Sequence, residues 1–221
     1  MKVVSFIPIK LNNQRLPGKN LMLLNKRPLC DYIFNTIINV SLLDENYVYC
    51  SDERIKEYLP HGIEYLKRDS CLDSPDTKGT DIIASFLKDI EADIYLITHV
   101  TQPFTKIDSL EFALRKVISE GYDSAFSAVE LQDYCWYQGK PVNYDINNLV
   151  PTQQLEPVYM ETGAFYIFKR EVFESSQRRI GDNPYMYIVD RFEAIDIDTR
   201  EDFNIAEAAA LFLETGNERV L

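Results

Sequence analysis

The chain has 221 residues, of which 46% are hydrophobic and 26% are charged, an ordinary balance for a globular protein. Its formal net charge of -12 argues against nucleic acid as a partner, because phosphate backbones are met by basic surfaces. No apolar run reaches the roughly 20 residues of a membrane span, and the start of the chain does not read as a signal peptide. We therefore expect a cytoplasmic protein without a membrane partner, folded as a single domain of residues 1–221.

The cysteines and histidines give no sign of a metal cluster. The four cysteines are far apart and form no Cys-x-x-Cys pair, so neither zinc nor a disulfide framework is indicated. We expect each to be a small buried hydrophobic residue: Cys30, Cys50, Cys71 and Cys135. The two histidines are too few for a multi-histidine metal site.

The first predicted element is a strand at Val3–Ile9, whose residues are mostly β-branched or aromatic, as in a strand buried on both faces of a parallel sheet. Such a sheet binds ligands beyond the carboxyl ends of its strands. The loop that follows offers cations and carboxamides, namely Lys10, Asn12, Asn13, Gln14, Arg15 and Lys19. These groups suit a phosphate chain. The loop matches neither the Walker A pattern nor the dinucleotide-binding glycine pattern, so an ordinary surface loop is the alternative.

Helical and strand patterns then alternate along the chain, which is typical of an α/β protein. The patterns predict helices at 28–40, about 81–90, 107–119 and from Thr199 to about Leu213, with a further helix start at Ser51-Asp52-Glu53. They predict strands at 47–50, 63–66, 92–98, 124–129 and 164–168. His99 follows one of these strands, where a capping or core role and a ligand contact are both open.

Residues 130–158 break this alternation. They are rich in Tyr, Asn, Gln and Pro and show no clear period. Aromatic residues without a period suggest an extended excursion that packs on something, and a second subunit is the natural candidate.

The loop sequence Leu16-Pro17-Gly18-Lys19-Asn20-Leu21 resembles the signature of the cytidylyltransferases that activate 3-deoxy-ulosonic sugar acids, the CMP-sialate and CMP-3-deoxy-octulosonate synthetases. Two later segments are also similar to that family: Ile195-Asp196-Ile197-Asp198-Thr199, and Thr162-Gly163-Ala164 with the strand that follows. The resemblance implies a three-layer α/β/α Rossmann-like nucleotide-diphospho-sugar transferase fold with a mixed, mostly parallel sheet. It also implies a homodimer in which residues 130–158 contribute to the dimer contact and the substrate site.

The resemblance implies a transfer of CMP from CTP to a sugar acid with release of pyrophosphate. Lys10, Lys19 and Asp198 would be the catalytic residues. The nucleotide would be bound by Lys10, Asn12, Arg15, Lys19, Asn20, Arg68, Asp76 and Thr77. The acceptor would be bound by Thr101, Gln102, Gln153, Gln154, Thr162 and Gly163.

The acidic pair near the end of the chain is a predicted metal site. In an extended strand Asp196 and Asp198 face the same side, because side chains alternate. Two carboxylates so placed suit Mg²⁺, which takes oxygen ligands and completes its shell with water and substrate phosphates. A surface strand with two solvated acids is the alternative.

The chain departs from the family pattern where the sialate branch holds the sugar carboxylate with arginines, since those positions are Thr152 and Met160. The acceptor is therefore open, and three hypotheses follow. The first is a cytidylyltransferase for a sugar acid. The second is a nucleotidyltransferase of the same fold that uses another nucleotide or a non-acidic acceptor. The third is a binding or regulatory protein that keeps the nucleotide pocket without turnover.

Overall fold

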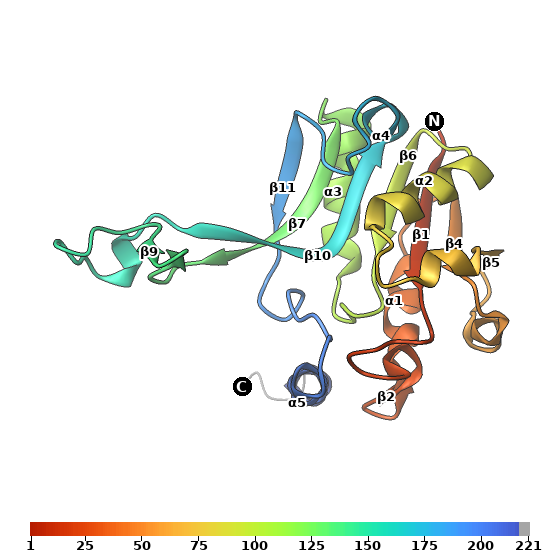
Figure 1. Cartoon of the computed structure of the whole chain (residues 1–221), viewed down its shortest axis with the longest axis horizontal. Coiled ribbons are helices and arrows are strands. Elements are labelled where there is room, and N and C mark those ends of the chain that lie inside the picture. The colour runs from red at the N-terminus through yellow and green to blue at the C-terminus, as the bar shows by residue number, and fades with distance from the viewer. Residues whose placement is uncertain (217–221) are drawn as a thin grey trace.

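The computed structural model describes residues 1–216, and a seven-stranded sheet forms its centre (Figure 1). The strand order across the sheet is β11-β7-β10-β6-β1-β4-β5. The strands are β1 (Val3–Ile9), β4 (Glu45–Cys50), β5 (Glu64–Lys67), β6 (Ile94–Thr98), β7 (Ser124–Leu131), β10 (Val158–Lys169) and β11 (Pro184–Ile188). Neighbouring strands are parallel except that β10 is antiparallel to both β6 and β7. The prediction of an α/β fold with a mixed, mostly parallel sheet is confirmed.

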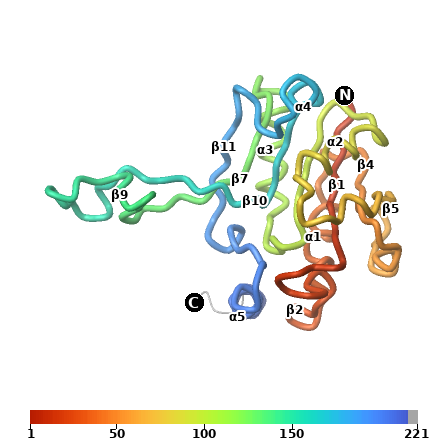
Figure 2. Tube along the Cα trace, in the orientation of Figure 1, coloured from red at the N-terminus to blue at the C-terminus, as the bar shows by residue number. Residues whose placement is uncertain are grey.

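Helices cover both faces of this sheet and make three layers (Figure 2). The helices are α1 (Leu29–Ile38), α2 (Gly79–Asp89), α3 (Ile107–Ser119), α4 (Arg170–Ser176) and α5 (Arg200–Gly216). Residues of α1 and α3 belong to the core cluster on one face of β1, which α5 joins beside β2 (Leu23–Leu24), and residues of α2 and α4 belong to the cluster on the other face. On the α2 side the rings of Phe6 and Phe86 stack with their centroids 4.0 Å apart. Such burial of aromatic surface on both faces holds β1 and β6 rigidly at the centre.

The structure differs from the predicted elements where local patterns are weak. The helix expected at residue 53 is a 3-10 helix, η2 (Glu53–Tyr58), capped by the Asp52 carboxylate, which accepts from the Arg54 amide at 3.0 Å. The patterns missed α4, β11 and the short hairpins β2 (Leu23–Leu24) with β3 (Arg27–Pro28) and β8 (Trp136–Tyr137) with β9 (Lys140–Pro141). Three short 3-10 turns were missed as well: η1 (Lys19–Leu21), η3 (Ser70–Asp73) and η4 (Thr152–Gln154).

Two further expectations are corrected. Cys71 is exposed and Cys135 half-buried, because both lie in polar loops, whereas Cys30 and Cys50 are buried as expected. Residues 195–198 are not a strand. They follow a turn and run beside the loop after β6, where the Ile197 amide donates to the Thr101 carbonyl at 2.9 Å.

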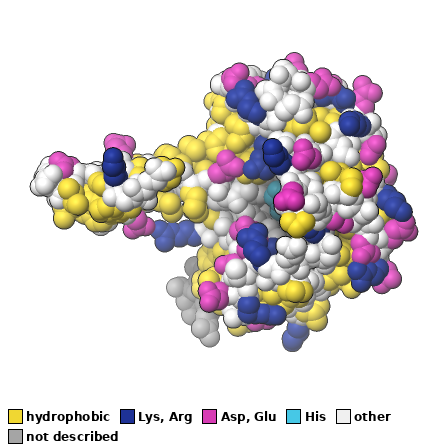
Figure 3. Space-filling model, in the orientation of Figure 1, with side chains coloured by type: hydrophobic (Ala, Val, Ile, Leu, Met, Phe, Trp, Pro, Cys, Tyr) yellow, Lys and Arg dark blue, Asp and Glu magenta, His cyan; other side chains and the backbone are white. Residues whose placement is uncertain are grey.

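An arm projects from the sheet, as Figure 1 shows. The ends of β7 and β10 run on together as a two-stranded ribbon, and residues 132–157 lie beyond it. The register shifts between Glu161 and Tyr166, at Gly163, whose φ of 78° lies in the region that favours glycine. Hydrophobic side chains gather along the arm in Figure 3, and the exposed ones in it are Tyr134, Trp136, Tyr137, Val142, Ile146 and Leu149.

Among residues 1–216, no helix combines the length and the apolar character that crossing a membrane requires.

Candidate functional site

The candidate site lies where the carboxyl ends of β1, β4 and β6 meet. The loop after β1 begins at Lys10, and the segment 195–198 that precedes α5 lies against it. The β1 loop itself lines a cavity of about 190 Å³ with Lys10, Asn13, Gln14, Arg15, Leu16 and Lys19. Parallel strands place their ends at the same edge of the sheet, so the fold brings these separate segments together.

Lys19 is a buried amine at the centre of the site. The turn before it uses Gly18 with a φ of 71°, and η1 then points the lysine inward. Its Nζ donates to the Ile197 carbonyl at 2.7 Å and to Oδ1 of Asp198 at 2.9 Å. NH1 of Arg15 lies 2.6 Å from Oδ2 of Asp198, so both carboxylate oxygens are held by cations. The predicted residues Arg15, Lys19 and Asp198 therefore form one cluster.

Asp196 lies beside this cluster. Its side chain is reached by solvent, yet protein atoms crowd around it, and this partial desolvation raises the pKa of the carboxyl group. A hydrogen bond from Thr101 opposes that shift in pKa, and the charge of Asp198 adds to it. Ile197 between the two acids is completely buried, so the carboxylates both stay on the outer side.

The two carboxylates form a donor set that fits Mg²⁺ as a partial set of ligands. Burial and then the charge of Asp198 raise the pKa of Asp196, and a bound cation would stabilise its ionised form. Among residues 1–216, no group of three or more His, Cys, Asp or Glu side chains could hold a metal ion. Oxygens of a bound substrate and of water would have to complete the shell, as is usual for Mg²⁺.

Asn20 and Lys10 hold the start of the loop. Nδ2 of the buried Asn20 donates to the Lys10 carbonyl at 2.8 Å. The Lys10 amine donates to the carbonyl of Asp73, which lies at the end of η3. The Lys10 side chain therefore bridges the ends of two segments and lines the cavity of the β1 loop.

Arg68, predicted to bind the nucleotide, is only 2% exposed. Its NH2 donates to the Ile9 carbonyl at 2.9 Å and pairs with Oδ1 of Asp73 at 2.5 Å, while its NH1 donates to the Tyr49 carbonyl at 3.3 Å. These contacts give Arg68 a positioning role, and its contact with the nucleotide stays a prediction. The guanidinium ties together the carboxyl ends of β1 and β4 and holds the loop that carries Asp73.

A second group of predicted residues meets near β10. Gln102 is buried and its Nε2 donates to the Thr162 carbonyl, while its Oε1 has no hydrogen-bond partner among the described residues. The Thr162 hydroxyl donates to Ser127 Oγ at 2.8 Å. A Cβ on Gly163 would lie 3.5 Å from Gln102 Nε2, so glycine here permits a close approach of the backbone to that side chain.

The remaining predicted residues do not join these clusters. Asn12 and Asp76 are exposed on loops, and Thr77 is half-buried on the loop before α2. Gln153 and Gln154 are exposed in η4 on the arm, outside the sheet edge that carries the other residues. The ribbon carries these glutamines away from the sheet of their own chain, and their contact with an acceptor stays a prediction.

The sequence missed two residues that the structure places at the site. Asp73 accepts from Lys10 through its carbonyl and from Ser51 and Arg68 through its carboxylate. Arg179 lines a small cavity with His99. Neither residue stands in a motif, so no local signal identifies them.

His99 lies at the carboxyl end of β6. Burial, the charge of Arg179 and the charge of Lys19 together lower its pKa from 6.5 to about 4. The imidazole is therefore neutral near pH 7 and can donate and accept a hydrogen bond.

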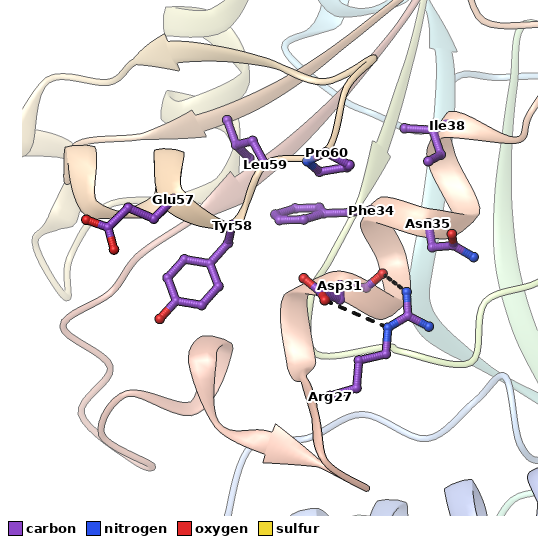
Figure 4. A pocket seen from close by; sticks show the side chains of 9 residues that line it. All are labelled: Arg27, Asp31, Phe34, Asn35, Ile38, Glu57, Tyr58, Leu59 and Pro60. Carbon is purple, nitrogen blue, oxygen red and sulfur yellow. Dashed lines mark hydrogen bonds and ion pairs between the residues drawn. The ribbon is translucent and has the colours of Figure 1, made fainter.

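Another pocket lies away from the site, between α1 and the segment 57–60 (Figure 4). Arg27 and Asp31 line this pocket. NH2 of Arg27 donates a hydrogen bond to the backbone carbonyl of Asp31 at 2.6 Å. None of the predicted site residues lines it.

Residues 4–208 match the family model described as Cytidylyltransferase. The N-acylneuraminate cytidylyltransferase of Streptococcus agalactiae serotype V is 25% identical over 214 residues, which are 92% of this chain and 52% of that protein. The pseudaminic acid cytidylyltransferase of Campylobacter jejuni is 24% identical over 221 residues, covering 94% of this chain and 95% of that one. This chain thus spans about half the length of its streptococcal relatives.

Among solved structures, the chain is similar to a CMP:2-keto-3-deoxy-manno-octonic acid synthetase complexed with CTP. The TM-score is 0.72 at 18% sequence identity, over 96% of this chain and 99% of that one. A similarity at this identity establishes the fold, and it agrees with the layered sheet described above.

Proposed function

The chain belongs to the cytidylyltransferase family, and from that premise we propose that it transfers CMP from CTP to a sugar acid and releases pyrophosphate. Curated relatives that match most of this chain are named for sialic and pseudaminic acids, which supports a nonulosonate-like acceptor.

One observation carries the proposal: the cationic β1 loop faces the acidic pair across the carboxyl end of the sheet. Lys10, Arg15 and Lys19 line a cavity of about 190 Å³, and Lys19 and Arg15 reach Asp198. A triphosphate needs cations along its length, and its metal needs carboxylates at its edge. A site that offers both at adjacent positions suits a metal nucleotide.

In the proposed reaction a hydroxyl of the acceptor loses its proton and forms a bond to the α-phosphorus of CTP, while the bond from that phosphorus to the bridging oxygen breaks. Lys19 and Lys10 would neutralise charge on the phosphates, and the buried position of Lys19 strengthens its effect. Asp196 and Asp198 would hold Mg²⁺, which supplies further neutralisation of phosphate charge when bound. Such a transfer depends on positioning and charge more than on covalent help.

We also propose that two copies of the chain pair through the arm. The arm exposes Trp136, Ile146 and Leu149 at more than half of their surfaces, and its aromatic rings pack mainly on each other. Apolar groups so presented are covered in most proteins by a partner. The acceptor-binding roles predicted for Gln153 and Gln154 then belong to the partner's site. Because CTP is an intracellular metabolite, we expect the enzyme to work in the cytoplasm.

The test is pyrophosphate release with Mg²⁺ across the four ribonucleoside triphosphates and a panel of acceptors. The panel contains sialic, legionaminic, pseudaminic and octulosonic acids together with neutral sugars. Release that requires CTP and one of the acids supports the proposal. Release with another nucleotide or with a neutral sugar would instead show a nucleotidyltransferase of the same fold with other substrates. If CTP binds but no pyrophosphate is released with any acceptor, the chain is a binding protein.

A further inference from the structure

A sugar acid needs a cation for its acid group, and the proposed function already assigns Lys10 and Lys19 of the β1 loop to the phosphates of CTP. Lys19 and Arg15 pair with Asp198, and Lys10 donates to the Asp73 carbonyl. We propose that Arg179, which lines a small cavity with His99, binds the carboxylate of the acceptor. This inference rests on the proposed function and names the residue that would select acidic acceptors.

Arg179 belongs to the segment 177–183 between α4 and β11, and its side chain reaches the face of the sheet that α2 covers. Its Cζ lies 3.5 Å from the centroid of the Tyr166 ring, a cation-π contact. Its NH2 lies 3.2 Å from Oε1 of Glu161, and the Tyr166 hydroxyl donates to that same oxygen. One face and one edge of the guanidinium are therefore fixed by neighbours.

The rest of the guanidinium lies beside a small cavity at the start of α2. A Cβ on Gly79, the first residue of α2, would lie 4.0 Å from NH1 of Arg179. Nε and NH1 make no hydrogen bond to any residue that the structure describes. Arg179 and His99 complete the lining of a small cavity of about 50 Å³ whose other residues are apolar apart from Gly79. The amino end of α2 carries partial positive charge, which also favours an anion here.

Arg179 also lies next to the predicted acceptor-binding residues Thr162 and Gly163 of β10. Glu161 precedes Thr162 in β10, and a Cβ on Gly163 would lie 3.8 Å from the Tyr166 hydroxyl that helps to brace Arg179. A planar guanidinium can donate two parallel hydrogen bonds to a carboxylate, here from NH1 and the remaining hydrogen of NH2. The Glu161 carboxylate beside it can accept from hydroxyl groups of the same substrate. The pair thus fits a polyhydroxy acid.

The arrangement accounts for the family arginines that are absent at Thr152 and Met160. Met160 is half exposed and precedes Glu161, so the guanidinium of Arg179 contacts the residue adjacent to that position. An arginine from a separate segment of the chain would then supply the charge.

Steady-state pyrophosphate release tests the inference with Arg179→Gln, Arg179→Lys and the matched control Arg178→Gln. Arg178 pairs with Asp182 on the surface at 2.6 Å and lines no part of the site. The substrates are CTP, the acid from the panel that the wild type uses best, and the methyl ester of that acid. We expect the acceptor KM of Arg179→Gln to rise by about 10- to 100-fold with the KM for CTP unchanged, as for loss of a charged hydrogen bond. Arg179→Lys should lie between, and Arg178→Gln should match the wild type.

The methyl ester gives a readout that a structural role would not move. The wild type should prefer the acid over its ester, and Arg179→Gln should lose that preference. An unchanged acceptor KM, or a rise in the KM for CTP instead, overturns the role of Arg179 while the proposed function stands. If Arg179→Gln does not fold, a wild-type acceptor KM for Arg179→Lys overturns the two-point contact. If the wild type releases no pyrophosphate with any of the acids, both the proposed function and the role of Arg179 are overturned.

Discussion

Lys19 and Asp198 are 179 residues apart in the sequence, yet Nζ of the lysine lies 2.9 Å from Oδ1 of the aspartate. The same amine donates to the carbonyl of Ile197, so the loop after β1 and the segment before α5 are joined at two points. Several measurable consequences depend on which groups in the site are buried and which are exposed.

The two cations on Asp198 should differ in their effect on CTP binding. Lys19 is buried, whereas the Arg15 side chain is 69% exposed and screened by water. We expect Lys19→Met to weaken CTP binding about 10-fold or more, because a charge-assisted bond in a buried site is lost. Arg15→Met should weaken it by only about 2- to 5-fold. Titration calorimetry with CTP measures both, and equal effects would contradict this ranking.

Asp198→Asn should abolish Mg²⁺-dependent turnover while the protein stays folded. The substitution removes a carboxylate charge that the proposed metal site requires, and the shape of the side chain is preserved. Turnover is measured as pyrophosphate release, and binding of Mn²⁺ in the presence of CTP gives an independent readout. Asp182→Asn is the matched control, because Asp182 is exposed and pairs only with Arg178 among the described residues. Wild-type turnover in Asp198→Asn would overturn the metal assignment.

Asp73→Ala should destabilise the protein by about 3 to 5 kcal/mol, because it leaves the buried guanidinium of Arg68 without its acidic partner. The loss should appear as a lower midpoint of urea unfolding. Asp76→Ala in the same loop changes an exposed carboxylate and should stay within about 0.5 kcal/mol of the wild type. Similar losses in the two variants would show that Asp73 acts through the loop rather than through Arg68.

The sequence predicts the strands and helices whose buried residues give a clear hydrophobic pattern. The strand Val3–Ile9 and the helix Ile107–Ser119 were predicted to the residue, because one is apolar throughout and the other is strongly amphipathic. β11 (Pro184–Ile188) was missed although its residues are apolar or aromatic, because it is short, opens on a proline and lies half-buried at the edge of the sheet. Residues 195–198 carry a strand-like alternation, but no neighbouring strand pairs with them, so they remain irregular.

The site could be predicted only in part for a different reason. Lys19, Asn20 and Asp198 stand in family motifs, so a resemblance identifies them. Arg179 stands in no motif, and its contacts with Tyr166 and Glu161 arise because β10 and the segment 177–183 meet in the folded chain. The burial of Arg68 depends likewise on the ends of β1 and β4, which the local sequence does not describe.

Removing the apolar groups of the arm should convert a dimer to a monomer. Trp136 and Leu149 are 53% and 64% exposed, so Trp136→Asp with Leu149→Asp should leave each protomer stable while it breaks the proposed contact. Light scattering at several protein concentrations measures the mass. Ile205→Asp with Leu211→Asp on α5 is a matched control, because these residues are similarly exposed away from the arm. A wild-type monomer at every concentration would contradict the dimer.

Stability without ligand should fall as the pH falls from 7.5 to 5, and His99 should account for part of the fall. The folded pKa of about 4 lies below the ordinary value of 6.5, so the unfolded chain takes up the proton first. The stabilising contribution is therefore complete above pH 6.5 and is lost progressively as the pH falls from 6.5 toward 4. At pH 5 the loss of stability is at most about 2 kcal/mol, and it is smaller to the extent that water reaches the half-buried imidazole.

Urea unfolding of the wild type and His99→Gln at pH 7.5 and pH 5 measures this loss of stability. The variant cannot take up this proton, so its stability should fall less, and an identical fall in the two proteins would show that folding does not lower the pKa of His99.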